Sequence, residues 1–152
     1  MLRVTVPPDM QDVFRSALAR AKSRECGGIL MGEHVGHNHF FVRSVTVQTA
    51  GGFAWFLRGV SSAVNAVRSF LAANGNDYRR FNYLGEWHSH PSFSVVPSAT
   101  DHETMRDMAR TTEGATFLVL LIFRLDGTSL VGSAHTYLPD GAVHPSTLEL
   151  EI

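Results

Sequence analysis

The sequence is poor in cysteine, in clustered positive charge and in long apolar segments. Its single cysteine, Cys26, cannot form a disulfide within the chain, which predicts a reducing, cytoplasmic setting. Lys and Arg number 13 against 14 Asp and Glu, and no basic block occurs. Because phosphate binding requires clustered Lys and Arg, nucleic acid is not expected as the main partner. No apolar run is long enough to span a bilayer and the first residues show no signal-peptide pattern, so no membrane association is expected.

The length and composition predict one domain. With 152 residues, of which 44% are hydrophobic, the chain is the size of a single domain with one core, so we predict one domain over residues 1–152. Apolar residues at helical spacing favour helices over 9–23, 60–73 and 98–112. The continuous apolar run 117–123 predicts a central strand buried on both faces.

The order of elements predicts the fold class. Val- and Phe-rich stretches at 2–6 and 39–47 indicate further strands, 53–57 a short one, and 146–152 a last edge strand. Helices interrupt strands that are largely joined as hairpins. We therefore predict an α+β (α/β-like) domain with a central mixed β-sheet flanked by helices.

Histidine is the abundant functional residue type, with eight in the chain, and two of them begin the stretch "HSHPSFSVVPSATD" from His88 to Asp101. Side chains alternate along a strand, so His88 and His90 are expected on one face, where both imidazoles can converge on one metal ion. Pro91 ends the strand and therefore places both histidines at a strand end, beside a cleft.

The stretch from Ser98 to Asp101 has the spacing of a helix start. A capping box explains both residues without any chemistry, but the same cap would hold an ionised Asp101 carboxylate in place as a third metal ligand. Two histidines and one aspartate leave a fourth tetrahedral position for water, which is typical of a catalytic zinc site. Such a site also needs a proton acceptor, and Glu25, just before Gly27 and Gly28, is the best candidate.

The pattern His-x-His, seven residues, Ser, two residues, Asp, with an upstream Glu in "ECGGILMG", resembles the JAMM (MPN-plus) metalloprotease family. The resemblance covers most of the chain and implies a cytidine-deaminase-like JAB/MPN domain. It implies one Zn²⁺ per chain with His88, His90 and Asp101 as ligands and water as the fourth. By the same likeness Glu25 is the general acid/base, and Ser98 helps to hold the developing oxyanion.

The resemblance also implies a substrate class. Members of this family cleave isopeptide or peptide bonds after the C-terminal tail of ubiquitin or a ubiquitin-like protein, so the expected partner is such a protein or its conjugate. The chain looks like the stand-alone bacterial branch, some members of which belong to antiphage operons that also encode conjugation enzymes. Others trim sulfur-carrier proteins, and the residues do not choose between these two roles.

Two other function classes compete with the peptidase. Two histidines and a carboxylate also form the facial triad of non-haem iron oxygenases, although the spacing speaks against that reading. A non-catalytic binding module would keep the metal without turnover.

Other residues offer weaker alternatives. Glu86 shares a strand face with His88, but a cross-strand salt bridge is favoured for it. Cys26 is more typical of a small buried residue than of a nucleophile. The "HVGHNHF" stretch, with His34, His37 and His39, favours a solvated hairpin turn over a second metal site. Trp55 and Phe56 belong equally well to the core or to a cleft edge that receives a substrate tail.

Overall fold

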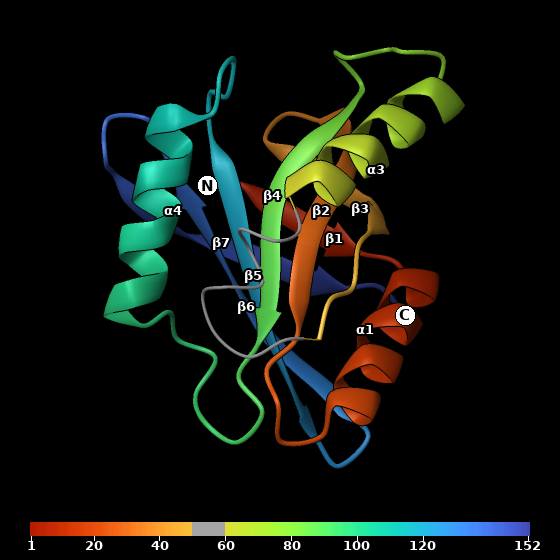
Figure 1. Cartoon of the computed structure of the whole chain (residues 1–152), viewed down its shortest axis with the longest axis vertical. Coiled ribbons are helices and arrows are strands. Elements are labelled where there is room, and N and C mark those ends of the chain that lie inside the picture. Colours follow the sequence, from red (N-terminus) through yellow and green to blue (C-terminus); the bar gives the residue numbers. More distant parts are fainter. Residues whose placement is uncertain (50–59) are drawn as a thin grey trace.

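The computed structural model describes residues 1–49 and 60–152 (Figure 1). The strand predicted at 53–57, and the role of Trp55 and Phe56 beside a cleft, lie outside the described residues. The helices are α1 (Pro8–Ala21), α3 (Val60–Ala73) and α4 (Ala99–Thr111). The strands are β1 (Arg3–Val6), β2 (Gly27–Gly36), β3 (His39–Val45), β4 (Phe81–Ser89), β5 (Leu118–Asp126), β6 (Ser129–Tyr137) and β7 (Val143–Leu150).

The predicted helix-flanked central sheet is wrong, and so is the JAB/MPN arrangement that the family resemblance implied. The described strands close into a mixed barrel in the order β1-β3-β2-β4-β5-β6-β7. Closure comes from β1, which pairs in parallel with β3 on one side and with β7 on the other, Arg3 opposite both His39 and Thr147. The C-terminal strand is therefore not an edge. No local pattern signals the pairing of β1 with β7, because the two strands are more than a hundred residues apart in the chain.

The apolar run predicted as a central strand is confirmed. β5 pairs in parallel with β4 and antiparallel with β6, and its residues from Leu118 to Phe123 are all buried. Alternate residues enter two separate clusters, as strand geometry requires. Val119, Leu121 and Phe123 pack with Phe14 of α1, whereas the even-numbered residues pack with Met105 of α4. The two helices therefore cover opposite faces of this part of the barrel wall.

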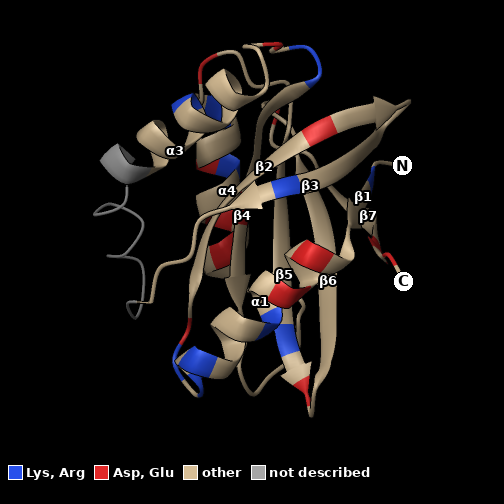
Figure 2. Ribbon diagram, turned by 90° about the vertical axis from the view of Figure 1, so that its right-hand side faces the viewer, with Lys and Arg blue, Asp and Glu red and all other residues tan. Residues whose placement is uncertain are grey.

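Several local predictions are also confirmed. Pro8 opens α1, consistent with its fixed φ, and α3 has the predicted limits. The glycine pair that begins β2 permits a close approach, since a Cβ on Gly28 would lie 2.0 Å from the Thr46 carbonyl oxygen. None of the described helices is long and apolar enough to cross a membrane. Lys and Arg are spread over helices, strands and turns and are not gathered on one element (Figure 2).

The barrel places the predicted motif at one end of β4. This strand lies between β2 and β5, with His88 opposite Gly27 on one side and Ile122 on the other. The backbone N–H of His90 donates to the Phe123 carbonyl at 2.9 Å, so the sheet pairing extends past the last strand residue. The chain then crosses to α4, whose first turn returns to the same end of β4.

Candidate metal centre

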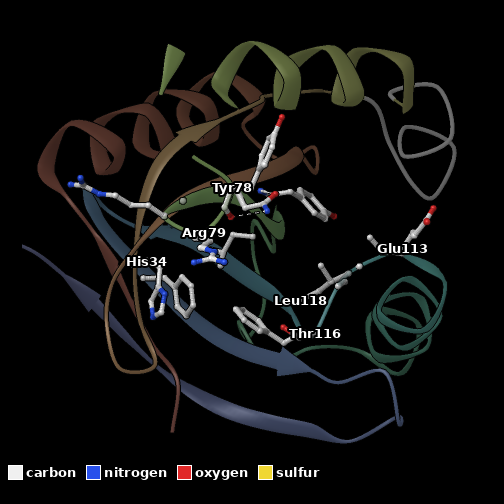
Figure 3. Close-up of a pocket in the computed structure, with 16 residues that line it drawn as sticks. His34, Tyr78, Arg79, Glu113, Thr116 and Leu118 are labelled. Atoms are coloured by element: carbon white, nitrogen blue, oxygen red, sulfur yellow. Dashed lines mark hydrogen bonds between the residues drawn. The ribbon is translucent and has the colours of Figure 1, made fainter. Parts of the chain in front are cut away.

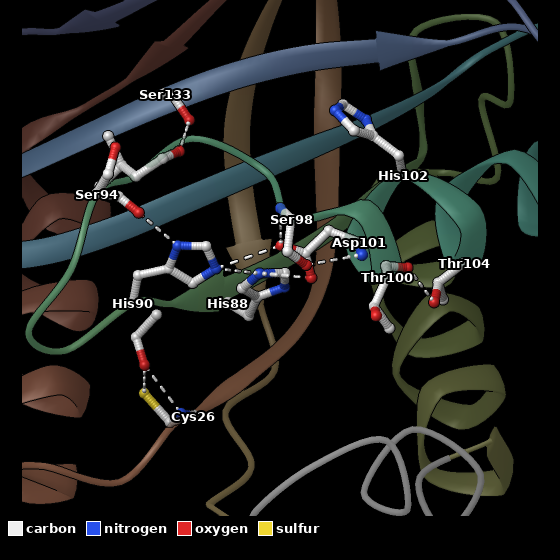
Figure 4. Close-up of polar contacts among 12 residues, drawn as sticks. Cys26, His88, His90, Ser94, Ser98, Thr100, Asp101, His102, Thr104 and Ser133 are labelled. Atoms are coloured by element: carbon white, nitrogen blue, oxygen red, sulfur yellow. Dashed lines mark hydrogen bonds and ion pairs between the residues drawn. The ribbon is translucent and has the colours of Figure 1, made fainter.

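The structure brings His88, His90 and Asp101 together. The two imidazole Nε2 atoms are 3.2 Å apart, and each lies 3.3 Å from a carboxylate oxygen of Asp101 (Figure 4). His88 and His90 share a strand face, as alternation predicts. Asp101 comes from the first turn of α4, twelve or so residues further along, and reaches the pair because the connecting segment folds back over the strand end.

Hydrogen bonding fixes the tautomer of His90. Its side chain is almost fully buried, and its Nδ1 lies 2.6 Å from the backbone carbonyl oxygen of Ser94. A carbonyl can only accept, so Nδ1 is the donor in this bond, which leaves Nε2 as the nitrogen that could bind a metal ion. Nε2 faces Asp101 and His88. A hydrogen bond from the other ring nitrogen to a backbone carbonyl is what orients a histidine ligand in a metal site.

Asp101 is oriented by the start of α4. The Ser98 hydroxyl accepts a hydrogen bond from the Asp101 N–H at 3.0 Å, and the Ser98 N–H donates to Asp101 Oδ2 at 2.8 Å, which is a complete capping box. Burial alone would raise the pKa of the Asp101 carboxyl. Hydrogen bonding to His88, the charge of His88 and the bonds from Ser98 outweigh burial and hold the pKa well below its ordinary value. The carboxylate is therefore an anionic, positioned oxygen donor.

The three donor atoms fit a small metal ion. One donor atom from each residue lies within 4.8 Å of the others, and no other group of this kind occurs among the described residues. Metal–ligand bonds of about 2.0–2.1 Å at tetrahedral angles place neighbouring ligand atoms roughly 3.3–3.4 Å apart. The 3.2 Å between the two Nε2 atoms is close to that spacing, and each Nε2 lies 3.3 Å from its own oxygen of Asp101, Oδ1 for His88 and Oδ2 for His90. Two imidazole nitrogens and a carboxylate oxygen are donors that Zn²⁺ accepts.

The chain at Glu25 runs beside this centre. The Cys26 carbonyl accepts from the Ser89 N–H at 2.9 Å, so the pairing of Gly27 with His88 continues towards Glu25 and His90. Glu25 is partly exposed, and among the described residues no hydrogen bond or ion pair links its carboxylate to the three donors. The structure thus places the Glu25 backbone next to the candidate centre, and its role as a base stays a prediction.

Ser98 lies at the rim of the centre and is exposed. Its oxygen accepts from the Asp101 N–H, which leaves the hydroxyl hydrogen free to donate outward. The cap and the predicted oxyanion contact use different parts of the same hydroxyl group. The two interpretations of Ser98 are therefore compatible in this geometry, and the catalytic one stays a prediction.

The alternative groups are engaged elsewhere. Glu86 is buried and accepts a hydrogen bond from the Tyr83 hydroxyl at 2.8 Å, and not the salt bridge favoured for it. Burial raises the pKa of Glu86 to about 8 although the Tyr83 bond lowers it, so the carboxyl is mostly protonated at neutral pH. Burial likewise raises the pKa of the Cys26 thiol, against a smaller lowering by Ser89, so a nucleophilic thiolate is disfavoured. His102 points away from the centre and bonds the Tyr137 hydroxyl (Figure 4).

A separate cleft opens at the other end of β4 (Figure 3). It has a volume of about 480 Å³, and Asn82 and Tyr83 of β4 line it together with His34 and Phe40. None of the three candidate ligands lines this cleft. The convergence of donor atoms, and not this cleft, therefore locates the candidate chemistry.

Three contributors to the centre were missed by the sequence analysis. The Ser94 carbonyl fixes His90, and the Phe93 ring stacks on the His90 imidazole with centroids 4.2 Å apart. The Ser89 hydroxyl accepts from the Cys26 N–H at 2.9 Å and so anchors the chain next to Glu25. Only the position of Ser89 between the histidines hinted at its role, since alternation turns it to the opposite face. The contacts of Phe93 and Ser94 depend on the path of an irregular segment.

Comparison with known proteins identifies relatives of the chain. Residues 7–137 match the model of a family described as prokaryotic homologs of the JAB domain. Protein DSY2949 from Desulfitobacterium hafniense has a similar solution structure, with a TM-score of 0.66 at 22% identity, covering 97% of this chain and 92% of that one. The solution structure of a protein from Salinibacter ruber is also similar, with a TM-score of 0.55 at 19% identity, covering 97% of this chain and 91% of that one. At these identities the likeness shows a shared fold alone. A search of the curated proteins found no match.

Proposed function

Because the chain belongs to the family of prokaryotic JAB-domain homologues, which includes metalloproteases, we propose that it is a zinc-dependent peptidase. The observation that supports this most strongly is the convergence of His88, His90 and Asp101, whose two Nε2 atoms are 3.2 Å apart and each lie 3.3 Å from an oxygen of the same carboxylate. These three residues lie within the part of the chain that matches the family model. Three protein ligands leave one position open, which is typical of catalytic and not of structural zinc sites.

In the proposed reaction the chain's own residues handle protons and charge. Zinc at this centre would polarise the scissile carbonyl and lower the pKa of a bound water. Glu25 would accept the proton of the attacking water and pass it to the leaving amine. The free hydroxyl hydrogen of Ser98 would donate to the developing oxyanion. His90, held by Ser94, would keep its lone pair aimed at the metal.

The proposed substrate is the C-terminal tail of a ubiquitin-like protein, joined to its target through an isopeptide or a peptide bond. The two arms of this proposal are deconjugation of a ubiquitin-like modifier, as in bacterial antiphage defence, and trimming of a sulfur-carrier protein. Both substrates end in an extended tail, and they differ in the folded protein that carries it.

The test is cleavage of two fusions, a ubiquitin-like protein and a sulfur-carrier protein, each extended beyond its C-terminal glycines. We compare the wild type with Glu25→Gln and use Glu113→Gln, an exposed carboxylate away from the centre, as the matched control. The proposal predicts one zinc per chain in all three proteins and cleavage by the wild type and the control alone. Loss of a general acid/base should cost about 10²–10⁴-fold in rate.

Other outcomes would replace the proposal. Zinc without cleavage by any of the proteins would indicate a non-catalytic, metal-bound module. Iron in place of zinc would favour the oxygenase reading of the same two histidines and one carboxylate. Full activity of Glu25→Gln would contradict the role given to Glu25.

A further inference from the structure

The segment between β4 and α4, residues 91–97, contacts His90 through two consecutive residues and β6 through the next one. The Phe93 ring stacks on His90 at 4.2 Å and 23°, and the Ser94 carbonyl accepts from His90 Nδ1 at 2.6 Å. The Val95 carbonyl accepts a hydrogen bond from the Ser133 hydroxyl at 2.5 Å. Figure 4 shows Ser133 on one side of the segment and His90 on the other.

The two contacts on His90 restrict different motions. The Nδ1–H bond lies in the plane of the imidazole ring, so its hydrogen bond to Ser94 restricts rotation of the ring within that plane. The stacked Phe93 ring opposes tilting out of the plane. Together they orient Nε2 towards the carboxylate of Asp101. The orientation of the ring therefore depends on the position of the segment that supplies both contacts.

Burial holds the middle of the segment weakly, because Phe93 is 47% exposed and Val96 is 64% exposed. Pro97, at the end of the segment next to α4, is buried. Val95 packs partly against the cluster beneath α4. Among the described residues, the bond from Ser133 is the only hydrogen bond that ties this segment to β6. Ser133 lies on β6 opposite Ile122 of β5. The pairing of these two strands continues along the chain on both sides of Ser133.

We propose that Ser133 is a positioning residue for the metal centre, acting on the His90 ligand through the Phe93–Val95 segment. This inference rests on the proposed zinc site and adds a residue more than thirty positions beyond the motif. Ser133 itself contacts none of the three ligands. Removing its hydroxyl leaves the Val95 carbonyl without its hydrogen-bond partner. The Ser94 carbonyl and the Phe93 ring, which contact His90, then lose their fixed position.

The experiment measures zinc affinity by competition with a chromophoric chelator, and it needs no substrate. Ser133→Ala should bind zinc about 10-fold more weakly, at the lower end of the range seen when a residue that orients a metal ligand is removed. Ser133→Thr keeps the hydroxyl and should bind nearly as the wild type does. The matched control is Ser146→Ala, which removes a barrel-wall hydroxyl bonded to Thr136 and should leave the affinity unchanged.

A second readout separates positioning from general stability. With Co²⁺ in place of zinc, the visible d–d bands report ligand geometry, so Ser133→Ala should change these bands and Ser146→Ala should not. Wild-type zinc affinity and unchanged bands in Ser133→Ala would overturn the inference while the proposed function stands. Equal losses in both alanine variants would also overturn it, since they would reflect the barrel and not the centre. Absence of zinc binding by the wild type would overturn both proposals.

Discussion

Two histidine-rich regions lie at opposite ends of β4, and only one of them has the geometry of a metal site. His88 and His90 end β4, whereas His34 and His39 flank the β2–β3 turn, beside the residues that begin β4. Both regions contain a carboxylate, Asp101 in the first and Glu33 in the second. Counting residue types therefore does not distinguish them.

The difference lies in what the donor atoms contact. His34 stacks on Phe40, and His39 bonds Arg3 and Thr5, so their nitrogens do not converge. The Glu33 carboxylate is bound by Arg43 at 2.8 Å and by Arg80 at 2.6 Å. Asp101 faces no Lys or Arg in the described structure, and both histidine nitrogens point to it. A metal centre thus needs a carboxylate that no cation occupies and histidines aimed by their second contacts.

The largest expected effect separates the histidines of the two regions. His88→Ala should lower cleavage of the fusion substrate by at least about 10³-fold, because the electrostatic contribution of the whole centre is lost. His34→Ala should cleave at close to the wild-type rate. Single-turnover rates of the two variants measure this contrast. Cleavage by His88→Ala at the wild-type rate would contradict the role of His88 as a metal ligand.

Metal removal should destabilise the wild type. A ligand present at 1,000 times its dissociation constant stabilises the native state by about 4 kcal/mol, which corresponds to roughly 10 °C in melting temperature for a chain of this size. Thermal unfolding with and without a chelator should show this difference in the wild type and none in Asp101→Ala. Equal melting temperatures in the wild type would mean that no metal is bound.

The pH dependence of stability should identify Glu33 as a structural carboxylate. Burial would raise its pKa, but hydrogen bonds and charges from Arg80 and Arg43 hold the pKa below its ordinary value. Its stabilisation is therefore complete above the unfolded-state pKa of about 4.3 and is lost as pH falls through the lower native-state value.

Denaturant unfolding of Glu33→Gln tests this. The variant should lose about 1–3 kcal/mol at pH 7, the cost of disrupting a buried hydrogen-bonded charge, and the loss should shrink in acid. Its zinc content should equal that of the wild type. A loss of stability that does not vary with pH would show that the ion pairs are not its source.

The smallest expected effect concerns His39. His39→Gln removes side-chain contacts with Thr5 and Arg3, which should cost about 1 kcal/mol or less. Zinc affinity should not change. Loss of zinc in this variant, measured beside His37→Ala as an exposed control, would show that the turn region contributes to metal binding after all.

Local order was predictable from the sequence and global closure was not. The helix at 60–73, the buried run of β5 and the cap at Ser98 follow from short-range periodicity and hydrogen bonding. The barrel depends on β1 pairing with β7, which no neighbouring residue encodes. Treating the last strand as an edge was the error that produced an open sheet.

The candidate site divides in the same way. Strand alternation and helix capping were enough to predict that His88, His90 and Asp101 meet. The contacts made by Phe93, Ser94 and Ser133 could not be predicted, because they depend on how an irregular seven-residue segment crosses the end of a barrel. Sequence spacing thus located the donor atoms, and the structure revealed what aims them.

The most direct test of the central claim is the zinc content of three purified proteins: the wild type, Asp101→Ala and Glu33→Ala. The two variants each remove one carboxylate from a histidine-rich region. The account predicts one zinc per chain in the wild type and in Glu33→Ala, and none in Asp101→Ala. Zinc retained by Asp101→Ala, or absent from the wild type, would contradict it.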